Sequence, residues 1–164
     1  MGYIFQAIYG KRDYEGVSGI QGFYDIPKNT IETIVVGTSV AGNAVNTPML
    51  YEEYGICAYN LSVSWLPVLA SYFWTKEAYR NHSETLKTVI LEVGALTHTE
   101  EETKSYKASI DNMRLSKVKL EAISAYTENL NDTIENLIPL FSYHNRWNGN
   151  LDKLDMVLGS NMNL

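Results

Sequence analysis

The sequence is poor in the residues that usually build metal centres. Its 164 residues include one cysteine, Cys57, and three histidines, His82, His98 and His144. A single cysteine forms no internal disulfide and supplies no cysteine-based zinc site. The histidines are widely spaced and show no HxxxH or HExxH pattern. We therefore expect neither a metal nor a cofactor.

Long hydrophobic runs and an excess of basic residues are also missing. No segment approaches the roughly 20 apolar residues of a membrane-spanning helix, and the N-terminus does not have the pattern of a secretory signal. The 13 Lys and Arg residues against 19 Asp and Glu give a net charge of -6. This balance argues against nucleic-acid binding, which needs a basic surface. With 45% apolar and 20% charged residues, the chain should form one folded domain.

The first hundred residues predict strands alternating with helices. Ile34–Val36 is a continuous apolar run that stops at Gly37, which is typical of a central strand covered on both faces. The expected strands are 31–36, 56–61 and 86–93, and the expected helices between them are 47–54 and 67–81. Thr47 is the expected N-cap of the first helix and Gly55 its stop. Such an alternation predicts parallel strands with helices on both faces.

The two ends of the chain have a different pattern. Residues 1–22 look like a lead-in segment, in which the glycines indicate a loop or extended edge over 16–22. Residues 23–164 should form a single domain. After residue 99 the pattern is helical, with expected helices at 100–114, 116–129 and 132–147. Three strands are few for a free-standing α/β sheet, so we expect the first portion of a larger domain, or a domain completed by a partner. Its open sheet edge could pair copies of the chain.

The segment GTSVAG directly follows the first expected strand, where α/β sheets bind their ligands. Ser39 in this turn could serve as a nucleophile, as in the elbow of serine hydrolases, although the GxSxG pattern is not met. The same glycine spacing could cradle a phosphate. A third interpretation is a plain turn in which Thr38 and Ser39 cap the next helix. The pattern alone leaves all three open.

Several short motifs carry a family resemblance. FYDIPKN, EYGI, YNL and YFWTKEA occur in this order between residues 23 and 78, followed by LSKVKLEAI and PLFSYHNRW. Over roughly residues 20–150 they resemble the SGNH/GDSL-type hydrolases. More narrowly, they are similar to the extracytoplasmic SGNH-like proteins encoded beside membrane-bound O-acyltransferases, which act in the acylation of cell-surface polysaccharides. The resemblance implies a three-layer, flavodoxin-like α/β fold.

The resemblance also implies site residues. Ser39 corresponds to the nucleophile, in a turn with Gly37 and Thr38. The family's oxyanion donors lie in successive conserved blocks of its sequence. Here they would be the backbone N–H of Ser39, in the first block, and the backbone N–H of Ser62, in the second block, which includes Asn60. The third block, at residues 92–96, has no asparagine where the family has one. Loss of such a donor typically lowers the rate about 10²- to 10³-fold.

The catalytic base is the main departure from the family. The family's DxxH pair is missing, and the chain ends at Leu164 where the family continues. His144 is the best substitute as base or substrate contact, and lies beside Arg146, which could bind substrate. We also consider His98, whereas His82 should be a surface residue or one that interacts with the dipole at the C-terminus of its helix. The sequence thus predicts an SGNH-like esterase or O-acyltransferase acting on acyl (acetyl) esters of carbohydrate, with weak or no activity in this chain.

Two other functions and two locations stay open. The chain could be a truncated, inactive domain with a binding or assembly role, or a phosphate- or nucleotide-binding α/β module. The implied partners are an acyl-ester or carbohydrate substrate and a membrane-bound O-acyltransferase, with no nucleic acid. The resemblance implies an extracytoplasmic, membrane-associated protein, whereas a natural start at Met1 would place it in the cytoplasm.

Overall fold

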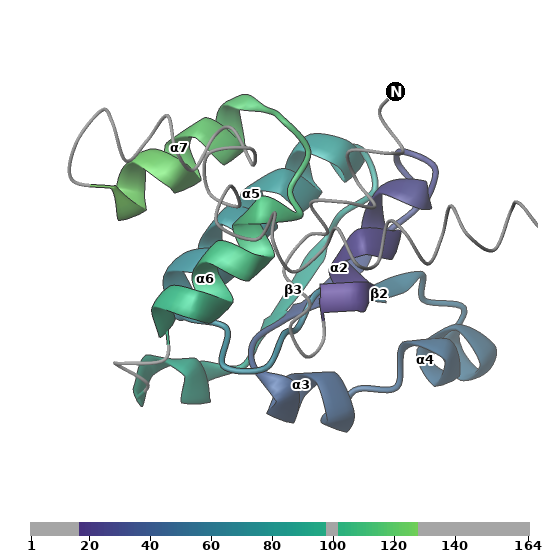
Figure 1. The fold of residues 1–164 in the computed structure, drawn as a ribbon. Helices are drawn as coiled ribbons and strands as arrows, with labels where there is room; N and C mark the ends of the chain where they lie inside the picture. The colour runs from purple at the N-terminus through teal and green to yellow at the C-terminus, as the bar shows by residue number, and fades with distance from the viewer. Residues whose placement is uncertain (1–16, 98–101, 128–164) are drawn as a thin grey trace, which may run out of the picture. The chain divides into compact units, whose positions relative to one another are not determined.

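The computed structural model describes residues 17–97 and 102–127, which contain a three-stranded parallel sheet (Figure 1). Its strands are β1 (Thr33–Val36), β2 (Ala58–Asn60) and β3 (Thr88–Leu91), in the spatial order β2-β1-β3. In the register, Thr33 lies beside Ala58 on one side and Thr88 on the other. The prediction of an α/β fold with parallel strands is confirmed. Because both pairings are parallel, all three carboxyl ends meet at one edge of the sheet.

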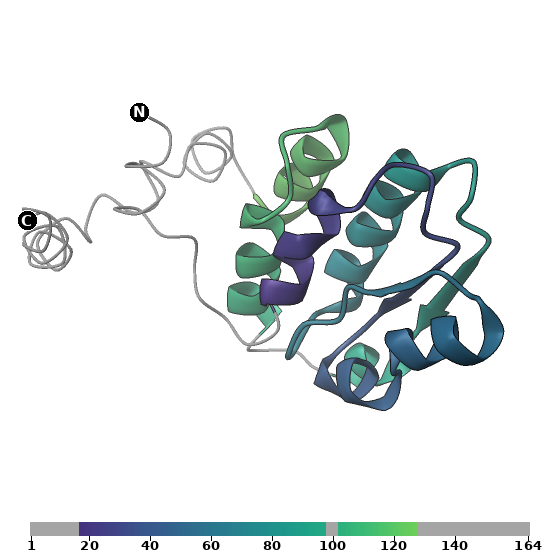
Figure 2. The same cartoon turned by 90° about the vertical axis from the view of Figure 1, so that its right-hand side faces the viewer.

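The first strand is central because its side chains can be buried on both faces. All four residues of β1 are buried, and three of them are β-branched aliphatics, which suit a covered strand. Helices α2, α5 and α6 lie on one side of the strands, whereas α4 lies on the other (Figure 2). The bounds of the helical elements are α2 Val17–Gly22, η1 Phe23–Asp25, α3 Ser39–Ala44, α4 Thr47–Tyr54, α5 Val68–His82, η2 Val93–Thr97, α6 Glu102–Asp111 and α7 Lys117–Tyr126.

Helix α4 begins and ends close to the predicted residues. Pro48 lies in its first turn, and Gly55 follows it in the left-handed conformation, with φ of 67°. The predicted glycine stop is therefore confirmed. The predicted N-cap is wrong by one residue, because the Asn46 side chain accepts the Met49 N–H at 3.1 Å. Thr47 is instead the first residue of the helix.

Two segments predicted as loops are helical. Residues 17–22 form α2, because Val17 and Ile20 lie three residues apart and both are buried. The expectation of a loop or extended edge over 16–22 is therefore wrong for these residues. Residues 39–44 form the short helix α3, although the small residues of GTSVAGNAVNT, directly after the first strand, predict a loop. The predicted helix at 132–147 lies outside the described residues.

The YFWTKEA motif contains Glu77, which connects α5 to other segments of the fold. Glu77 is completely buried, and its carboxylate accepts hydrogen bonds from the Tyr24 hydroxyl at 3.1 Å and the Arg80 Nε at 2.9 Å. The Ser116 hydroxyl donates to the same carboxylate at 3.1 Å, before α7. These donors compensate the buried charge, as a buried carboxylate requires. Glu77 thus joins α5 to the segments that begin near Tyr24 and Ser116.

Strand β3 is one of the two edge strands of the sheet, and it is the more exposed of the two. Val89, Ile90 and Leu91 are 42%, 39% and 46% exposed, although their apolar run resembles that of β1. The strand pairs with β1, and among the described residues no strand pairs with its other side.

The chain divides into two compact units. One consists of residues 13–122 and contains the whole sheet. The other consists of residues 1–12 and 123–164, of which the structure describes 123–127, including the end of α7.

Candidate functional site

A small polar pocket lies where the strands end at the carboxyl edge of the sheet. Its volume is about 350 Å³, within the usual range for small-molecule sites. Every described residue that lines it is a serine, an asparagine or a glycine: Ser18, Gly19, Ser39, Gly42, Asn43, Asn60, Ser62 and Ser64. The described part of the lining therefore offers hydroxyl, amide and backbone groups, without a formal charge or a large apolar side chain.

One wall of the pocket comes from α2, the helix that the sequence did not predict. Ser18 and Gly19 lie in this helix and line the pocket. The Tyr59 hydroxyl, on β2, donates to the Gly19 carbonyl at 2.5 Å and so ties α2 to the sheet. Burial raises the pKa of Tyr59, which keeps this donor protonated. The pairing joins residues 40 positions apart, which local sequence patterns do not reveal.

Ser39 is the first residue of α3 and lines the pocket. The preceding Thr38 caps this helix, because its Oγ1 accepts the Val40 N–H at 3.3 Å. Within residues 17–97 and 102–127, the Ser39 hydroxyl has no hydrogen-bonding partner. It is partly exposed, so the hydroxyl is accessible from the pocket.

The turn before Ser39 is fixed by Glu92, at the carboxyl end of β3. The Glu92 carboxylate accepts the Thr38 N–H at 3.1 Å and the Thr38 hydroxyl at 2.7 Å. Gly37 has φ of 153°, and a Cβ on it would lie 2.5 Å from the Glu92 Cβ. Only glycine allows this close approach. Sequence reasoning missed Glu92, because it looked for an asparagine in the third block.

Asn60 and Ser62 also line the pocket, but a hydrogen bond joins them to each other. The Asn60 side-chain oxygen accepts the Ser62 N–H at 3.0 Å, and the Asn60 amide donates to the Gly42 carbonyl at 3.3 Å. The Ser62 N–H, the expected second oxyanion donor, is therefore already occupied in this structure. The buried Ser62 hydroxyl has no partner in the described part of the chain.

The structure brings part of the predicted site together. Ser39, Asn60 and Ser62 share the pocket, and Gly37 and Thr38 form the turn that carries Ser39. His98, His144 and Arg146 lie outside the described residues, so their predicted roles stay predictions.

His82 is the last residue of α5, at the helix end where it was predicted, but the expectation of a surface residue is wrong. It is 1% exposed, and its Nδ1 accepts the backbone N–H groups of Thr30 and Ile31 at 3.3 and 3.4 Å. These residues precede β1, so His82 lies at the amino end of the strands, opposite the pocket. Burial lowers the pKa of His82, which favours the neutral ring. A role as base for Ser39 is excluded by this position.

No cluster of three or more potential metal ligands occurs among the described residues, and none of the helices described is long and apolar enough to span a bilayer. Comparison of the chain with protein-family models, curated proteins and solved structures gave no match.

Proposed function

We propose that the chain is an SGNH-like serine esterase or O-acyltransferase that acts on acyl esters of carbohydrate, with Ser39 as the nucleophile. The observation that carries the proposal is the position of Ser39. It follows the central strand of a parallel sheet, starts a helix, and presents to a polar pocket a hydroxyl with no hydrogen-bond partner among the described residues. Catalytic groups commonly occupy this edge of α/β sheets.

In the proposed reaction, the Ser39 Oγ attacks the carbonyl carbon of an ester and transfers its proton to a base. The new Oγ–acyl bond forms as the alcohol leaves with a proton. Water or a carbohydrate hydroxyl then takes the acyl group and restores the Ser39 hydroxyl. The Ser39 N–H is one proposed oxyanion donor. The Ser62 N–H is the second proposed oxyanion donor. Its hydrogen bond to the Asn60 side chain must break first, which adds a step before catalysis.

A histidine base must come from outside the described residues, since the one described histidine, His82, lies at the other end of the strands. His144 and His98 are the proposed candidates, with Arg146 as a substrate contact. Without the family's DxxH pair the base is less well oriented, so we expect weak activity from this chain. The family's membrane-bound O-acyltransferase is the proposed partner that would supply or receive acyl groups.

A phosphate-binding role is less favoured because backbone N–H groups at this turn already have acceptors. A phosphate at GTSVAG would need the backbone N–H groups there, but Thr38 donates its N–H to Glu92 and Val40 donates its N–H to Thr38. An inactive domain that assembles through the exposed β3 edge is the stronger alternative, because the apolar residues of this strand are uncovered.

The test is intact-mass analysis of the folded full chain after treatment with an alkyl fluorophosphonate. Attack by an activated serine forms an Oγ–phosphorus bond and releases fluoride, which leaves one adduct. We expect an adduct on the wild type and on Ser18→Ala, a matched control in the same pocket, but not on Ser39→Ala. A folded wild type without an adduct would contradict the proposal and favour the assembly role.

A further inference from the structure

We infer that the Ser64 hydroxyl binds a hydroxyl group of a neutral sugar in the pocket and so helps to select the substrate. The inference rests on the proposed function in one respect, namely that the carbohydrate part of the substrate enters the pocket. Ser64 lines the pocket together with Ser39, the proposed nucleophile. A sugar bound by Ser64 is therefore held in the same pocket as the serine that would attack its ester.

Ser64 is buried, yet the fold does not use its hydroxyl. The residue is 4% exposed, and its hydroxyl makes no hydrogen bond within residues 17–97 and 102–127. The Ser62 hydroxyl also has no partner there but is sealed from solvent, whereas that of Ser64 is not. Polar side chains as buried as this one normally have a hydrogen-bond partner. The pocket is where such a partner can bind.

The loop that carries Ser64 is fixed by backbone hydrogen bonds. It is a turn from Val63 to Leu66, because the Leu66 N–H donates to the Val63 carbonyl at 3.0 Å. The Val63 N–H donates to the Gly37 carbonyl at 3.1 Å, which ties the turn to the end of β1, two residues before Ser39. The backbone of the contact is therefore in place before a ligand binds, which lowers the entropic cost of binding.

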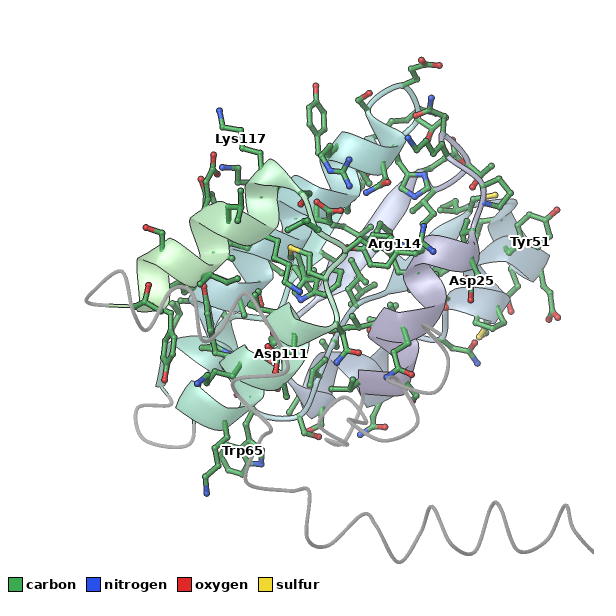
Figure 3. The ribbon with its side chains drawn as sticks, turned by 45° about the horizontal axis from the view of Figure 1, so that its top comes forward. Asp25, Tyr51, Trp65, Asp111, Arg114 and Lys117 are labelled. Atoms are coloured by element: carbon green, nitrogen blue, oxygen red, sulfur yellow. The ribbon has the colours of Figure 1, made fainter. Side chains whose placement is uncertain are left out.

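The two central residues of this turn differ in direction. Trp65 is 45% exposed, and Figure 3 shows its side chain directed away from the body of the domain. Ser64, beside it, is buried and lines the pocket. The buried Ser105 hydroxyl donates to the Trp65 carbonyl at 2.6 Å and fixes this side of the turn. The turn thus directs Ser64 toward the pocket.

The described lining favours a neutral ligand with hydroxyl groups. It has no carboxylate to bind a cation and no lysine or arginine to bind an anion. At the start of α3, the N–H groups of Thr38 and Val40 already have acceptors. Side chains such as those of Ser64 and Asn43 both donate and accept hydrogen bonds, as sugar hydroxyls do. A neutral sugar therefore matches the lining better than a charged ligand.

The experiment is an NMR titration of the isotope-labelled full chain with methyl glucopyranoside. Methyl glucuronide, which carries a carboxylate, and methyl glucosaminide, which carries an ammonium group, are the comparison compounds. The variants are Ser64→Ala and Ser64→Cys, which keeps a side chain of similar size but donates weakly. Ser71→Ala is the matched control. Ser71 is 1% exposed, its hydroxyl also has no partner among the described residues, and it is not in the described lining.

Thermal unfolding separates a binding role from a structural one. Because the Ser64 hydroxyl makes no hydrogen bond in the described part of the chain, its removal should not lower the melting temperature. A melting temperature that falls in both Ser64 variants but not in Ser71→Ala would assign the hydroxyl to the fold and overturn the inference.

We expect the wild type and Ser71→Ala to bind the pyranoside about five- to tenfold more tightly than either Ser64 variant does. Both charged sugars should bind the wild type more weakly than the pyranoside. No binding of the pyranoside, equal binding by the Ser64 variants, or equal binding of a charged sugar would overturn the inference. A Ser39 adduct in a chain whose sugar binding does not depend on Ser64 would overturn this inference alone. Ser64-dependent binding without an adduct would overturn only the proposed serine chemistry.

Discussion

Glu92 and Thr38 join the carboxyl ends of the two neighbouring strands β3 and β1. One Glu92 carboxylate oxygen accepts both the Thr38 N–H, at 3.1 Å, and the Thr38 hydroxyl, at 2.7 Å. Hydrogen bonds to an ionised acceptor are stronger than those between neutral groups. Because Ser39 follows Thr38 directly, this pairing fixes the turn that presents the proposed nucleophile.

Removing the Thr38 hydroxyl should destabilise the domain. Thr38→Val keeps the shape of the buried side chain but loses its bond to Glu92 and its cap on the Val40 N–H. We expect the free energy of unfolding to fall by about 1.5–3 kcal/mol. Urea denaturation measures this change, with Thr38→Ser as the control that retains both bonds. Equal losses in the two variants would contradict the proposed role of the hydroxyl.

A side chain at Gly37 should be poorly tolerated. In Gly37→Ala, the new Cβ would lie 2.5 Å from the Glu92 Cβ and 3.2 Å from the Ala41 Cβ, at a φ of 153°. Backbone strain and overpacking together should cost about 2–5 kcal/mol. Thermal or urea unfolding measures the cost.

Gly55→Ala is the control for that substitution. Gly55 has φ of 67° and open space around its Cα. Gly55→Ala therefore adds backbone strain but no overpacking, so we expect the free energy of unfolding to fall by about 1–2 kcal/mol. A cost at Gly37 no greater than that at Gly55 would show that Glu92 does not pack against the Gly37 backbone.

The sequence predicted the elements whose signals are local. The β-branched run Ile34–Val36 indicated a central buried strand, and Gly55 indicated the end of a helix. Features that depend on distant partners were missed. Helix α2 is fixed by contacts such as the bond from the Tyr59 hydroxyl to Gly19, and Glu92 contacts Thr38 54 residues away. No local pattern encodes either pairing.

The same distinction applies to the candidate site. The strand-turn-helix pattern predicted Ser39 at the sheet edge, because a parallel strand followed by small residues specifies that geometry. It did not reveal that Asn60 occupies the Ser62 N–H, or that His82 turns inward to accept the Thr30 N–H. Those contacts depend on packing between separate elements.

Burial of His82 should make stability depend on pH. Its pKa in the folded chain is below the ordinary value of 6.5, so the unfolded chain takes up a proton first as the pH falls. The stabilisation is complete above about pH 6.5 and is lost as the pH falls toward the folded pKa, by at most about 1.4 kcal/mol per pH unit. Urea denaturation between pH 7 and 5 measures the loss.

His82→Asn is the control for this prediction, because an asparagine oxygen can accept from Thr30 and does not titrate. Glu32 and Glu121 also have lowered pKa values, held down by hydrogen bonds from Lys87 and Lys76. Their ordinary value of 4.5 places their effect at lower pH. We expect the variant to lose less stability than the wild type over this interval. Identical pH profiles would contradict the assignment to His82.

Trp65, in the loop after β2, has a positive φ that bulky residues rarely adopt, and the strain of this backbone can be separated from the contacts of the side chain. Trp65→Ala and Trp65→Gly both remove the indole, but only glycine relaxes at φ of 57°. We expect Trp65→Gly to be more stable than Trp65→Ala by about 1 kcal/mol, although glycine usually costs stability relative to alanine. Thermal unfolding compares the two. A more stable alanine variant would show that the backbone leaves the left-handed region once the indole is removed.

The most direct test of the central claim is peptide mapping of the fluorophosphonate-treated wild-type chain by tandem mass spectrometry. Ser39 shares its pocket with Ser18, Ser62 and Ser64, which are chemically identical competitors. The account predicts a single adduct on Ser39, because activation depends on position at the end of β1 and not on access alone. An adduct on another pocket serine, or none on a folded chain, would contradict it.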